Sequence, residues 1–190
     1  MNSQNYITII TPAWNEETNL FLLNTALIKV FKNLEFTYEW IIIDDNSSDN
    51  TFSIIQSIAS QNKNVKGVRL AKNYGSHTAI RAGLNIAQGS CAIVLASDLQ
   101  DPPETIPHLL QKWRDGSQIV WAVRNDREGE SLMTKTLSWL YYWLMKNVVG
   151  LKNIHSSGSD YFLIDRKVIE AVKLFKESNM SIFSLISWLG

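Results

Sequence analysis

Cysteine, an excess of charge and long hydrophobic runs are all missing from this sequence. Cys91 is the only cysteine among the 190 residues, so no disulfide can form within the chain. Its apolar neighbours favour a buried core thiol over a reactive one, and a single cysteine fits a reducing compartment. Basic and acidic residues both number 18, so the formal net charge is zero and the composition gives no indication of nucleic-acid binding.

No stretch of the sequence has the roughly 18 uncharged apolar residues that a membrane-spanning helix needs. The nearest approach is residues 137–151, which are rich in Trp and Tyr but short and interrupted by Lys146. The first residues also lack the basic region and apolar core of a signal peptide. The composition is therefore that of a globular domain with room for one sizeable core.

Several common ligand-binding motifs are absent as well. No G-x-G-x-x-G follows the first apolar run, which argues against the usual dinucleotide fold, and the lack of any G-x-x-x-x-G-K-[ST] excludes a P-loop. The chain has no Cys/His cluster with metal-binding spacing. Its histidines, His77, His108 and His155, are scattered, and we interpret them as structural or exposed residues.

A regular alternation of strand-like and helix-like segments fills the first 125 residues. The strand-like segments are continuous apolar or β-branched runs, and the apolar residues between them have helical spacing. Continuous apolar strands need cover on both faces, so we predict an α/β fold with helices on both sides of a mostly parallel sheet. The predicted strands are 6–13, 38–45, 65–71, 91–97 and 117–124, and the predicted helices are 16–34, 51–61, 76–88 and 103–115.

The alternation breaks after residue 125. Residues 126–135 are polar, 136–150 have helical character, and 153–172 indicate a loop, a short strand and a helix. The last ten residues are apolar and helical in character but have no C-terminal cap, so we expect the protein to continue beyond residue 190.

Polar residues follow each of the five predicted strands. In an open parallel sheet, ligands bind beyond the carboxyl ends of the strands. The segments found there are PAWNEE, DDNSSD, KNYG, SDLQDPPE and RNDR, in chain order. Carboxylates with arginines nearby, here Arg124 and Arg127, suit a divalent metal ion together with a diphosphate. A single polar segment after a strand would usually be a helix cap or a solvated loop. The prediction of a ligand site therefore depends on the presence of such a segment after all five strands.

At these strand ends the sequence resembles a known family. The segments TPAWNEETNL, IIIDDNSSDNT, KNYGSHTAIRAGLNIAQG and SDLQDPPETIP are similar to those of inverting family 2 glycosyltransferases of GT-A fold, and especially of their polyprenyl-phosphate (dolichol-phosphate-type) branch. The resemblance covers about residues 5–172. It implies a single catalytic domain, 1–190, in which 5–125 bind a nucleotide-diphosphate sugar such as a UDP- or GDP-sugar and 126–190 serve the acceptor.

The resemblance also implies roles for individual residues in binding the nucleotide sugar. An aromatic ring beside a base, and an acid at a strand end that reaches ribose hydroxyls, agree with these roles. The residues expected to flank base and ribose are Pro12, Ala13, Trp14 and Glu16, with Asp44 or Asp45 hydrogen-bonded to either group, and Asn73, Ser97, Arg124 and Arg127 elsewhere on the donor.

The expected metal-binding motif departs from the family pattern. The family usually has Asp-x-Asp followed by Leu-Gln-Asp, whereas this chain has Ala96 in place of the first acid. Asp98 keeps the position of the usual metal ligand, and Gln100 can offer a carbonyl oxygen. Because Mg²⁺ keeps several waters and takes one or two carboxylates plus substrate phosphates, we expect Mg²⁺ or Mn²⁺ to bind, weakly without substrate. The alternative is that Asp98 and Asp101 only cap the following helix.

A second departure concerns the expected catalytic acids, Asp98 and Asp160. Asp160 matches the acid that the family usually follows with Phe-Arg-Leu, but Tyr161 and Phe162 come next here and the arginine is missing. A later Asp-Arg pair matches residues 165–166. A base is needed only if the acceptor is a sugar hydroxyl, since a lipid phosphate is already anionic near neutral pH. Asp160 is therefore a candidate base or a residue that orients acceptor or metal, with a structural turn as the alternative.

The resemblance thus predicts a metal-dependent transferase that passes a sugar to a polyprenyl phosphate at the cytoplasmic face of a membrane. Residues 137–151 then form either a core helix or an interfacial helix with Trp139, Tyr142, Trp143 and Lys146 at the membrane surface. Two alternatives remain open: transfer to a glycan hydroxyl in cell-surface polysaccharide synthesis, and a nucleotide-sugar-binding pseudoenzyme, which the two departures favour. A nucleotidylyltransferase would need a Gly-rich basic loop after the first strand, and none is present.

Overall fold

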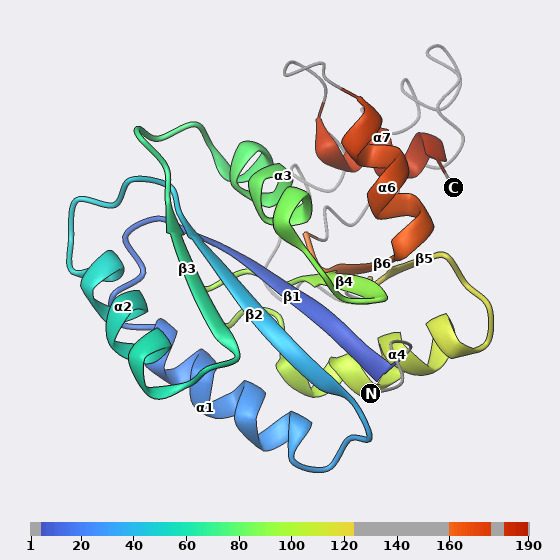
Figure 1. Cartoon of the computed structure of the whole chain (residues 1–190), viewed down its shortest axis with the longest axis horizontal. Coiled ribbons are helices and arrows are strands. Elements are labelled where there is room, and N and C mark those ends of the chain that lie inside the picture. Colours follow the sequence, from blue (N-terminus) through green and yellow to red (C-terminus); the bar gives the residue numbers. More distant parts are fainter. Residues whose placement is uncertain (1–4, 124–159, 176–180, 190) are drawn as a thin grey trace, which may run out of the picture.

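A six-stranded sheet forms the centre of the computed structural model, which describes residues 5–123, 160–175 and 181–189 (Figure 1). The order across the sheet is β3-β2-β1-β4-β6-β5. Neighbouring strands among β1 to β4 are parallel, and β6 runs antiparallel to both β4 and β5. The strands are β1 (Tyr6–Ala13), β2 (Thr37–Asp44), β3 (Val65–Arg69), β4 (Cys91–Val94), β5 (Ile119–Trp121) and β6 (Phe162–Asp165).

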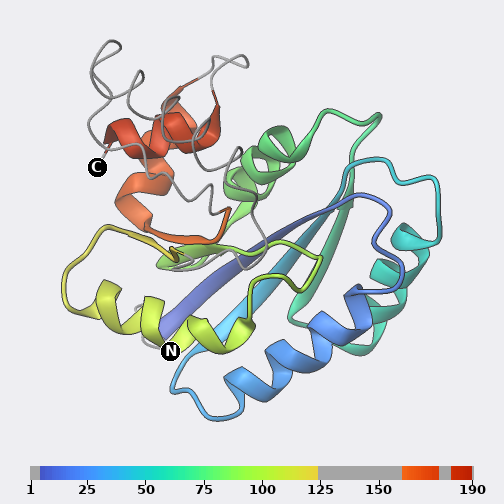
Figure 2. The ribbon, with the colours of Figure 1, turned by 180° about the vertical axis from the view of Figure 1, so that it is seen from behind.

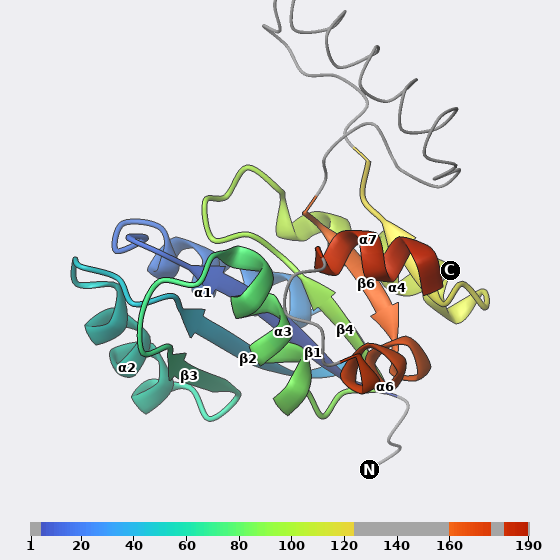
Figure 3. The same cartoon turned by 90° about the horizontal axis from the view of Figure 1, so that it is seen from above.

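Helices cover both faces of this sheet. In Figure 1 the strands β1 to β3 run between α1 below and α3 above; Figure 2 shows the same arrangement from behind, and Figure 3 looks down on it from the side of α3. One layer consists of α1 (Leu20–Phe31), α2 (Thr51–Gln61) and α4 (Ile106–Arg114), and the other of α3 (Ser76–Ile86), α6 (Arg166–Leu174) and α7 (Ile182–Leu189). The predicted α/β fold, with a mostly parallel sheet between two layers of helices, is confirmed.

The apolar strands explain why both layers are needed. Successive side chains of a strand point to opposite faces, so a continuous apolar run buries both. In β2, Trp40 and Ile42 belong to the core beneath α1 and α2, whereas Ile41 and Ile43 pack with Ala79 of α3. Both sets are fully buried. The sheet is therefore held from two sides, which leaves its strand ends as the places where polar groups meet solvent.

Several strands and helices are shorter than predicted where they meet the loops at the carboxyl ends of the strands. The helix predicted over 16–34 begins only at Leu20; residues 17–19 form a turn in which the Asn19 N–H donates to the Glu16 carbonyl at 3.1 Å. The strand predicted over 91–97 ends at Val94, and that predicted over 117–124 spans Ile119–Trp121. The helix predicted over 103–115 begins as a short 3₁₀ turn, Pro103–Thr105, before α4.

The predicted strand and helix within 153–172 are present as β6 and α6, and α7 lies within the apolar last segment. The predictions for 126–135 and 136–150 fall outside the described residues. Within the part of the chain that the structure describes, no helix combines the length and apolar character needed to cross a bilayer.

Candidate active site

The strand ends converge at one side of the sheet, here called the carboxyl edge, where β1 to β4 end. Ala13, the last residue of β1, is in register with Asp44 of β2, and Asp44 is in register with Arg69 of β3. Since β6 is antiparallel, its first residue, Phe162, pairs with Val94, the last residue of β4. The segment just before β6 therefore reaches the carboxyl edge as well, together with the loops after β1 to β4.

Side-chain hydrogen bonds join the loops after β1 and β2. The Asn15 N–H donates to the Ser47 hydroxyl at 2.9 Å, and the Ser48 N–H donates to Asn15 Oδ1 at 2.9 Å. The Glu16 N–H donates to Thr51 Oγ1 at 2.8 Å. Asn15 and Asn46 both have positive φ, at 57° and 59°, a conformation that asparagine tolerates better than most residues. The two loops thus form one cross-linked unit beside the β1 and β2 ends.

Asp49 connects the same two loops and contacts the start of α2. Its carboxylate accepts hydrogen bonds from the Thr51 N–H at 3.0 Å and the Glu17 N–H at 3.3 Å. Burial would raise the pKa of Asp49, but these hydrogen bonds outweigh it and hold the pKa below its usual value. The Asp49 carboxylate thus satisfies the N–H of the first residue of α2, whereas the Thr51 hydroxyl accepts from the Glu16 N–H.

Asp44 is fully buried at the end of β2, next to an arginine that the sequence analysis did not single out. Its Oδ1 accepts a hydrogen bond from the Ser47 N–H at 3.0 Å. Its Oδ2 lies 3.2 Å from Arg69 Nε, as an ion pair without hydrogen-bond geometry. Arg69 also donates to the Ser47 carbonyl at 2.8 Å. Arg69 was detectable from sequence as the basic residue at the end of a strand parallel to β2.

Asp45 fixes the loop after β3. Its two carboxylate oxygens accept hydrogen bonds from the Tyr74 N–H at 2.8 Å and the Gly75 N–H at 2.7 Å. Asn73 Oδ1 also faces the Gly75 N–H, at 3.2 Å. The contacts seen for Asp44 and Asp45 are thus with the protein itself. That either carboxylate accepts a hydrogen bond from base or ribose stays a prediction.

Two large aromatic side chains are exposed around this unit. Trp14 follows β1 and is 55% exposed, and Tyr74 follows β3 and is 50% exposed, with the Lys72 ammonium 5.0 Å from its ring centroid. Four of the other predicted donor-binding residues are less exposed than these two rings. Pro12 and Glu16 are half-buried, Ala13 and Ser97 are buried, and the Ser97 hydroxyl donates to the Pro12 carbonyl at 3.2 Å. The structure therefore offers an aromatic surface at the predicted base position.

The residues after β4 place one carboxylate in solvent. Asp98 and Gln100 are both exposed, and Asp98 Oδ1 accepts a hydrogen bond from the Gln100 N–H at 3.1 Å. Leu99 between them has a φ of 59°, so the chain turns sharply at this point. This hydrogen bond lies within the turn. Asp98 does not cap the helical segment that follows, Pro103–Thr105.

Asp160 lies two residues before β6, exposed at the same edge. The adjacent Tyr161 is buried, and its hydroxyl donates to the Pro102 carbonyl at 3.4 Å. Burial, and then the carboxylates of Asp101 and Glu104, raise the pKa of Tyr161 far above its usual value, so it remains a neutral donor. Tyr161 thereby joins the segment of Asp160 to the loop that follows Asp98.

The Asp-Arg pair at 165–166 lies at the opposite edge of the sheet. Asp165 pairs with Cys91, the first residue of β4. Its carboxylate accepts hydrogen bonds from the Lys167 N–H at 2.9 Å, as the N-cap of α6, and from Trp113 Nε1 at 2.7 Å. Arg166 donates to the carbonyls of residues 87 and 89. The pair therefore supports the fold and does not contact the candidate site.

The donor set at the end of β4 fits a hard divalent cation. Within the described ranges, no three or more His, Cys, Asp or Glu residues are grouped so that they could hold a metal. Asp98 and Gln100 supply a carboxylate and an amide oxygen, which suits an ion that takes its remaining ligands from phosphates and water. Arg124, Arg127 and the segment 137–151 lie outside the described residues.

Relatives of known sequence cover nearly the whole chain. An uncharacterized glycosyltransferase of Synechocystis sp. is 36% identical over 184 residues, which are 97% of this chain and 58% of that protein. The bactoprenol glucosyl transferase of Shigella phage SfV is 34% identical over 186 residues, which are 97% of this chain and 60% of that protein. The chain thus spans less than two thirds of the length of these curated relatives.

Solved structures share the fold. Glucosyl-3-phosphoglycerate synthase from Mycobacterium tuberculosis, solved with Mn²⁺, UDP-glucose and phosphoglyceric acid, aligns with a TM-score of 0.63 over 86% of this chain and 58% of that chain, at 21% identity. At an identity this low, the alignment shows the fold alone. The alignment confirms the GT-A fold that the sequence resemblance implied. Residues 8–173 match the family described as Glycosyl transferase family 2, and the chain belongs to that family.

Proposed function

We propose that this chain is the catalytic part of an inverting, metal-dependent glycosyltransferase. It would move a sugar from a UDP- or GDP-sugar to a polyprenyl phosphate at the cytoplasmic face of a membrane. The observation that supports this most is that Asp98 and Asp160 reach the carboxyl edge from neighbouring, oppositely directed strands. The similarity to a bactoprenol glucosyl transferase, at 34% identity, supports the lipid acceptor.

The donor would lie across the cross-linked loops after β1 and β2. The exposed Trp14 ring offers a face on which a base can stack, and the buried Asp44 and Asp45 keep the loops beneath it in place. Because these loops are already held in place, little entropy is lost in ordering them when a nucleotide sugar binds. Arg124 and Arg127 are proposed as further donor-binding residues, on the diphosphate.

Asp98 and Gln100 are the proposed ligands of Mg²⁺ or Mn²⁺. A bound ion would neutralise charge on the diphosphate as it leaves. The exposure of both side chains leaves their oxygens accessible to such an ion. With one carboxylate from this motif, we expect the phosphates of the donor to complete the coordination.

In the proposed reaction, an acceptor oxygen attacks the anomeric carbon opposite to the diphosphate. A new C–O bond forms as the bond to the diphosphate breaks, and the nucleoside diphosphate leaves with the electron pair, so the configuration inverts. A phosphate acceptor carries no proton that must be removed, so Asp160 would orient the acceptor. If a glycan hydroxyl were the acceptor, Asp160 would take its proton.

The test is a transfer assay with radiolabelled UDP- and GDP-sugars, Mn²⁺ and a short-chain polyprenyl phosphate. Asp98→Asn should lower the rate of transfer by about 100-fold or more, because it removes the carboxylate that would hold the metal ion beside the diphosphate. Asp115→Asn is the matched control, since this exposed carboxylate lies at the end of α4, away from the carboxyl edge. Normal transfer by Asp98→Asn would refute its assignment.

The same assay separates the alternatives. Transfer to soluble glycans but not to lipid phosphate would show that the acceptor is a hydroxyl and Asp160 an obligatory base. Nucleotide-sugar binding without any transfer would show a pseudoenzyme. The proposed membrane contact is tested by liposome co-sedimentation, which should weaken when Trp139 and Trp143 are both replaced by serine.

A further inference from the structure

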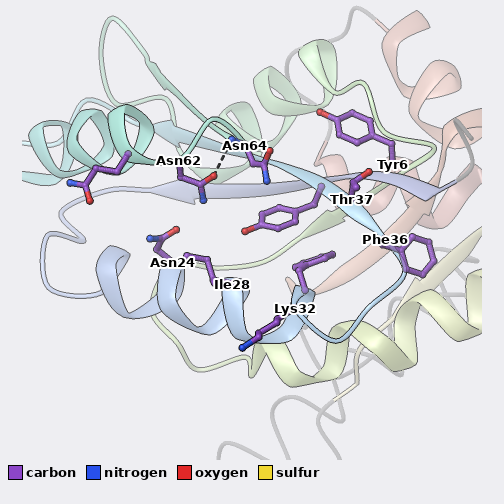
Figure 4. Close-up of a pocket in the computed structure, with 11 residues that line it drawn as sticks. Tyr6, Asn24, Ile28, Lys32, Phe36, Thr37, Asn62 and Asn64 are labelled. Carbon is purple, nitrogen blue, oxygen red and sulfur yellow. Dashed lines mark hydrogen bonds between the residues drawn. The ribbon is translucent and has the colours of Figure 1, made fainter. Parts of the chain in front are cut away.

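A hollow of about 780 Å³ opens at the side of the sheet where the parallel strands begin, here called the amino edge (Figure 4). It lies opposite to the candidate active site. It lies where β1 and β2 begin and where α1 and α2 end. Its volume falls in the range of about 300–1,000 Å³ that is typical of small-molecule sites. Residues that line it include Tyr6, Asn24, Ile28, Tyr38, Gln61 and Asn62.

Carboxamide side chains dominate the polar lining of this hollow. Asn24, Gln61, Asn62 and Asn64 contribute to it, and each amide can both donate and accept hydrogen bonds. Among the described residues that line it there is no carboxylate, and Lys32 is the only cation. A ligand that matches this lining presents donors and acceptors together and needs no charge of its own.

Two of these amides are placed for recognition. Asn62 is held by the Asn64 N–H, which donates to Asn62 Oδ1 at 3.0 Å (Figure 4). Asn24 Oδ1 is buried and has no hydrogen-bond partner within the described part of the chain. Buried acceptors are nearly always satisfied in folded proteins, so a rotation of the Asn24 side chain that presents this oxygen to a ligand hydroxyl would remove an unfavourable feature.

The remaining surface of the hollow is apolar, and the positive charge of Lys32 is offset by the partial negative charge of two helix C-termini. Ile28 is 48% exposed, and the rings of Phe31 and Tyr38 stack with centroids 4.1 Å apart behind it. Both α1 and α2 end here, and helix C-termini carry partial negative charge. The lining therefore combines apolar patches, mixed donors and acceptors, and no strong attraction for negative charge.

We infer that this hollow is a second binding site, for one or two units of a neutral saccharide. Each sugar hydroxyl both donates and accepts a hydrogen bond, as the carboxamides do, and the C–H groups of a sugar ring suit the apolar patch. The site is at the opposite edge from Asp98 and Asp160, so it would hold a glycan without occupying the donor site.

Saturation-transfer NMR titrations test this inference. The probes are glucose, N-acetylglucosamine and maltose, with glucuronate as the anionic counterpart of glucose. Saturable binding of at least one neutral sugar is expected, with weaker binding of glucuronate. Asn24→Leu and Gln61→Ala should each weaken binding about fivefold, as expected for one lost hydrogen bond. Gln56→Ala is the control, because Gln56 is an exposed residue of the same helix as Gln61 and does not line the hollow.

Competition distinguishes this hollow from the donor site. Saturating UDP with Mn²⁺ should leave the sugar signals unchanged, and circular dichroism should show that both pocket variants are folded. Displacement of the sugar by UDP would place it at the carboxyl edge and overturn the inference. Failure of all three neutral sugars to bind, or unchanged affinity in both folded pocket variants, would overturn it equally.

Discussion

The carboxylate of Asp45 accepts a hydrogen bond from the backbone N–H of Gly75 at 2.7 Å, which ties the end of β2 to the loop after β3. Gly75 has a φ of 85°, a conformation that costs glycine little and other residues much more. The loop with Asn73 and Tyr74 is therefore held by a carboxylate and by the conformation of one glycine. This arrangement connects the backbone conformation at Gly75 directly to the candidate donor site.

Gly75→Ala and Gly116→Ala make a matched pair of variants. Both glycines have positive φ, 85° and 103°, and a Cβ added at either would meet no atom within 4 Å. Each substitution should therefore destabilise the fold through strain alone, by about 1–3 kcal/mol in urea unfolding. Only Gly75→Ala should also weaken UDP or GDP binding in calorimetry, because Gly116 follows α4. An equal loss of affinity in both variants would contradict this.

Metal and nucleotide should bind synergistically. With Ala96 at the position of the family's first acid, we expect weak Mn²⁺ binding to the chain alone and at least about tenfold tighter binding with UDP or GDP present. Because coupling between two ligands is reciprocal, removing metal with EDTA should weaken nucleotide binding by the same factor. Asp98→Asn should abolish the coupling. Equal Mn²⁺ affinities with and without nucleotide would show that the protein supplies the full set of ligands.

Glu39 should contribute a measurable part of the acid sensitivity of the fold. Burial alone would raise its pKa, but hydrogen bonds from Lys66, Thr8 and the Gln88 N–H outweigh burial and lower it. A lowered folded pKa means that this stabilisation is fully present above the ordinary value of 4.5 and is lost as pH falls through the folded value. The free energy of unfolding in urea should therefore decline as pH falls below about 5.

Glu39→Gln is the variant that identifies this contribution. It should lose on the order of 1–3 kcal/mol at neutral pH and show a flatter decline in acid, because the charged hydrogen bonds are gone. Glu170→Gln is the comparison: Glu170 also has a lowered pKa, through Lys173 and Arg166, but it is exposed and should matter little. An unaltered pH profile for Glu39→Gln would exclude it as the source.

Asp165→Ala should affect stability and leave the candidate active site intact. The substitution removes the N-cap of α6 and the partner of Trp113 Nε1, so we expect a loss of about 2 kcal/mol. UDP affinity should stay within about twofold of the original, since Asp165 lies at the amino edge. A large loss of affinity at unchanged stability would reverse this assignment and return the Asp-Arg pair to the site.

The layers of the fold could be predicted from sequence because burial leaves a periodic trace. The run Trp40 to Ile43 has no polar residue, and only a strand covered on both faces accounts for it. The polar strand ends were predicted to gather on the general rule for parallel sheets, and the register of Ala13, Asp44 and Arg69 shows that they do.

The details of the site could not be predicted, because they depend on contacts between segments distant in sequence. Nothing near Asp45 in the chain indicates that its carboxylate binds the N–H groups of residues 74 and 75. The loop before α1 could not be predicted, because the Glu16 N–H in it is held by Thr51, which lies 35 residues away. The position of β6 could not be predicted either, because nothing in its own residues indicates that it lies between β4 and β5.

The direction of β6 has a consequence for how this enzyme family can diversify. The described chain passes the end of β5, Trp121, up to residue 123 and resumes at residue 160, just before β6; both points lie on the carboxyl edge because β5 and β6 are antiparallel neighbours. Whatever sequence joins these two points begins and ends beside Asp160 without interrupting the strands that carry the donor loops. If this joining segment selects the acceptor, as the proposed function requires, chimaeras cut at these two positions should exchange the acceptor preference and keep the nucleotide preference of the parent that supplies the sheet.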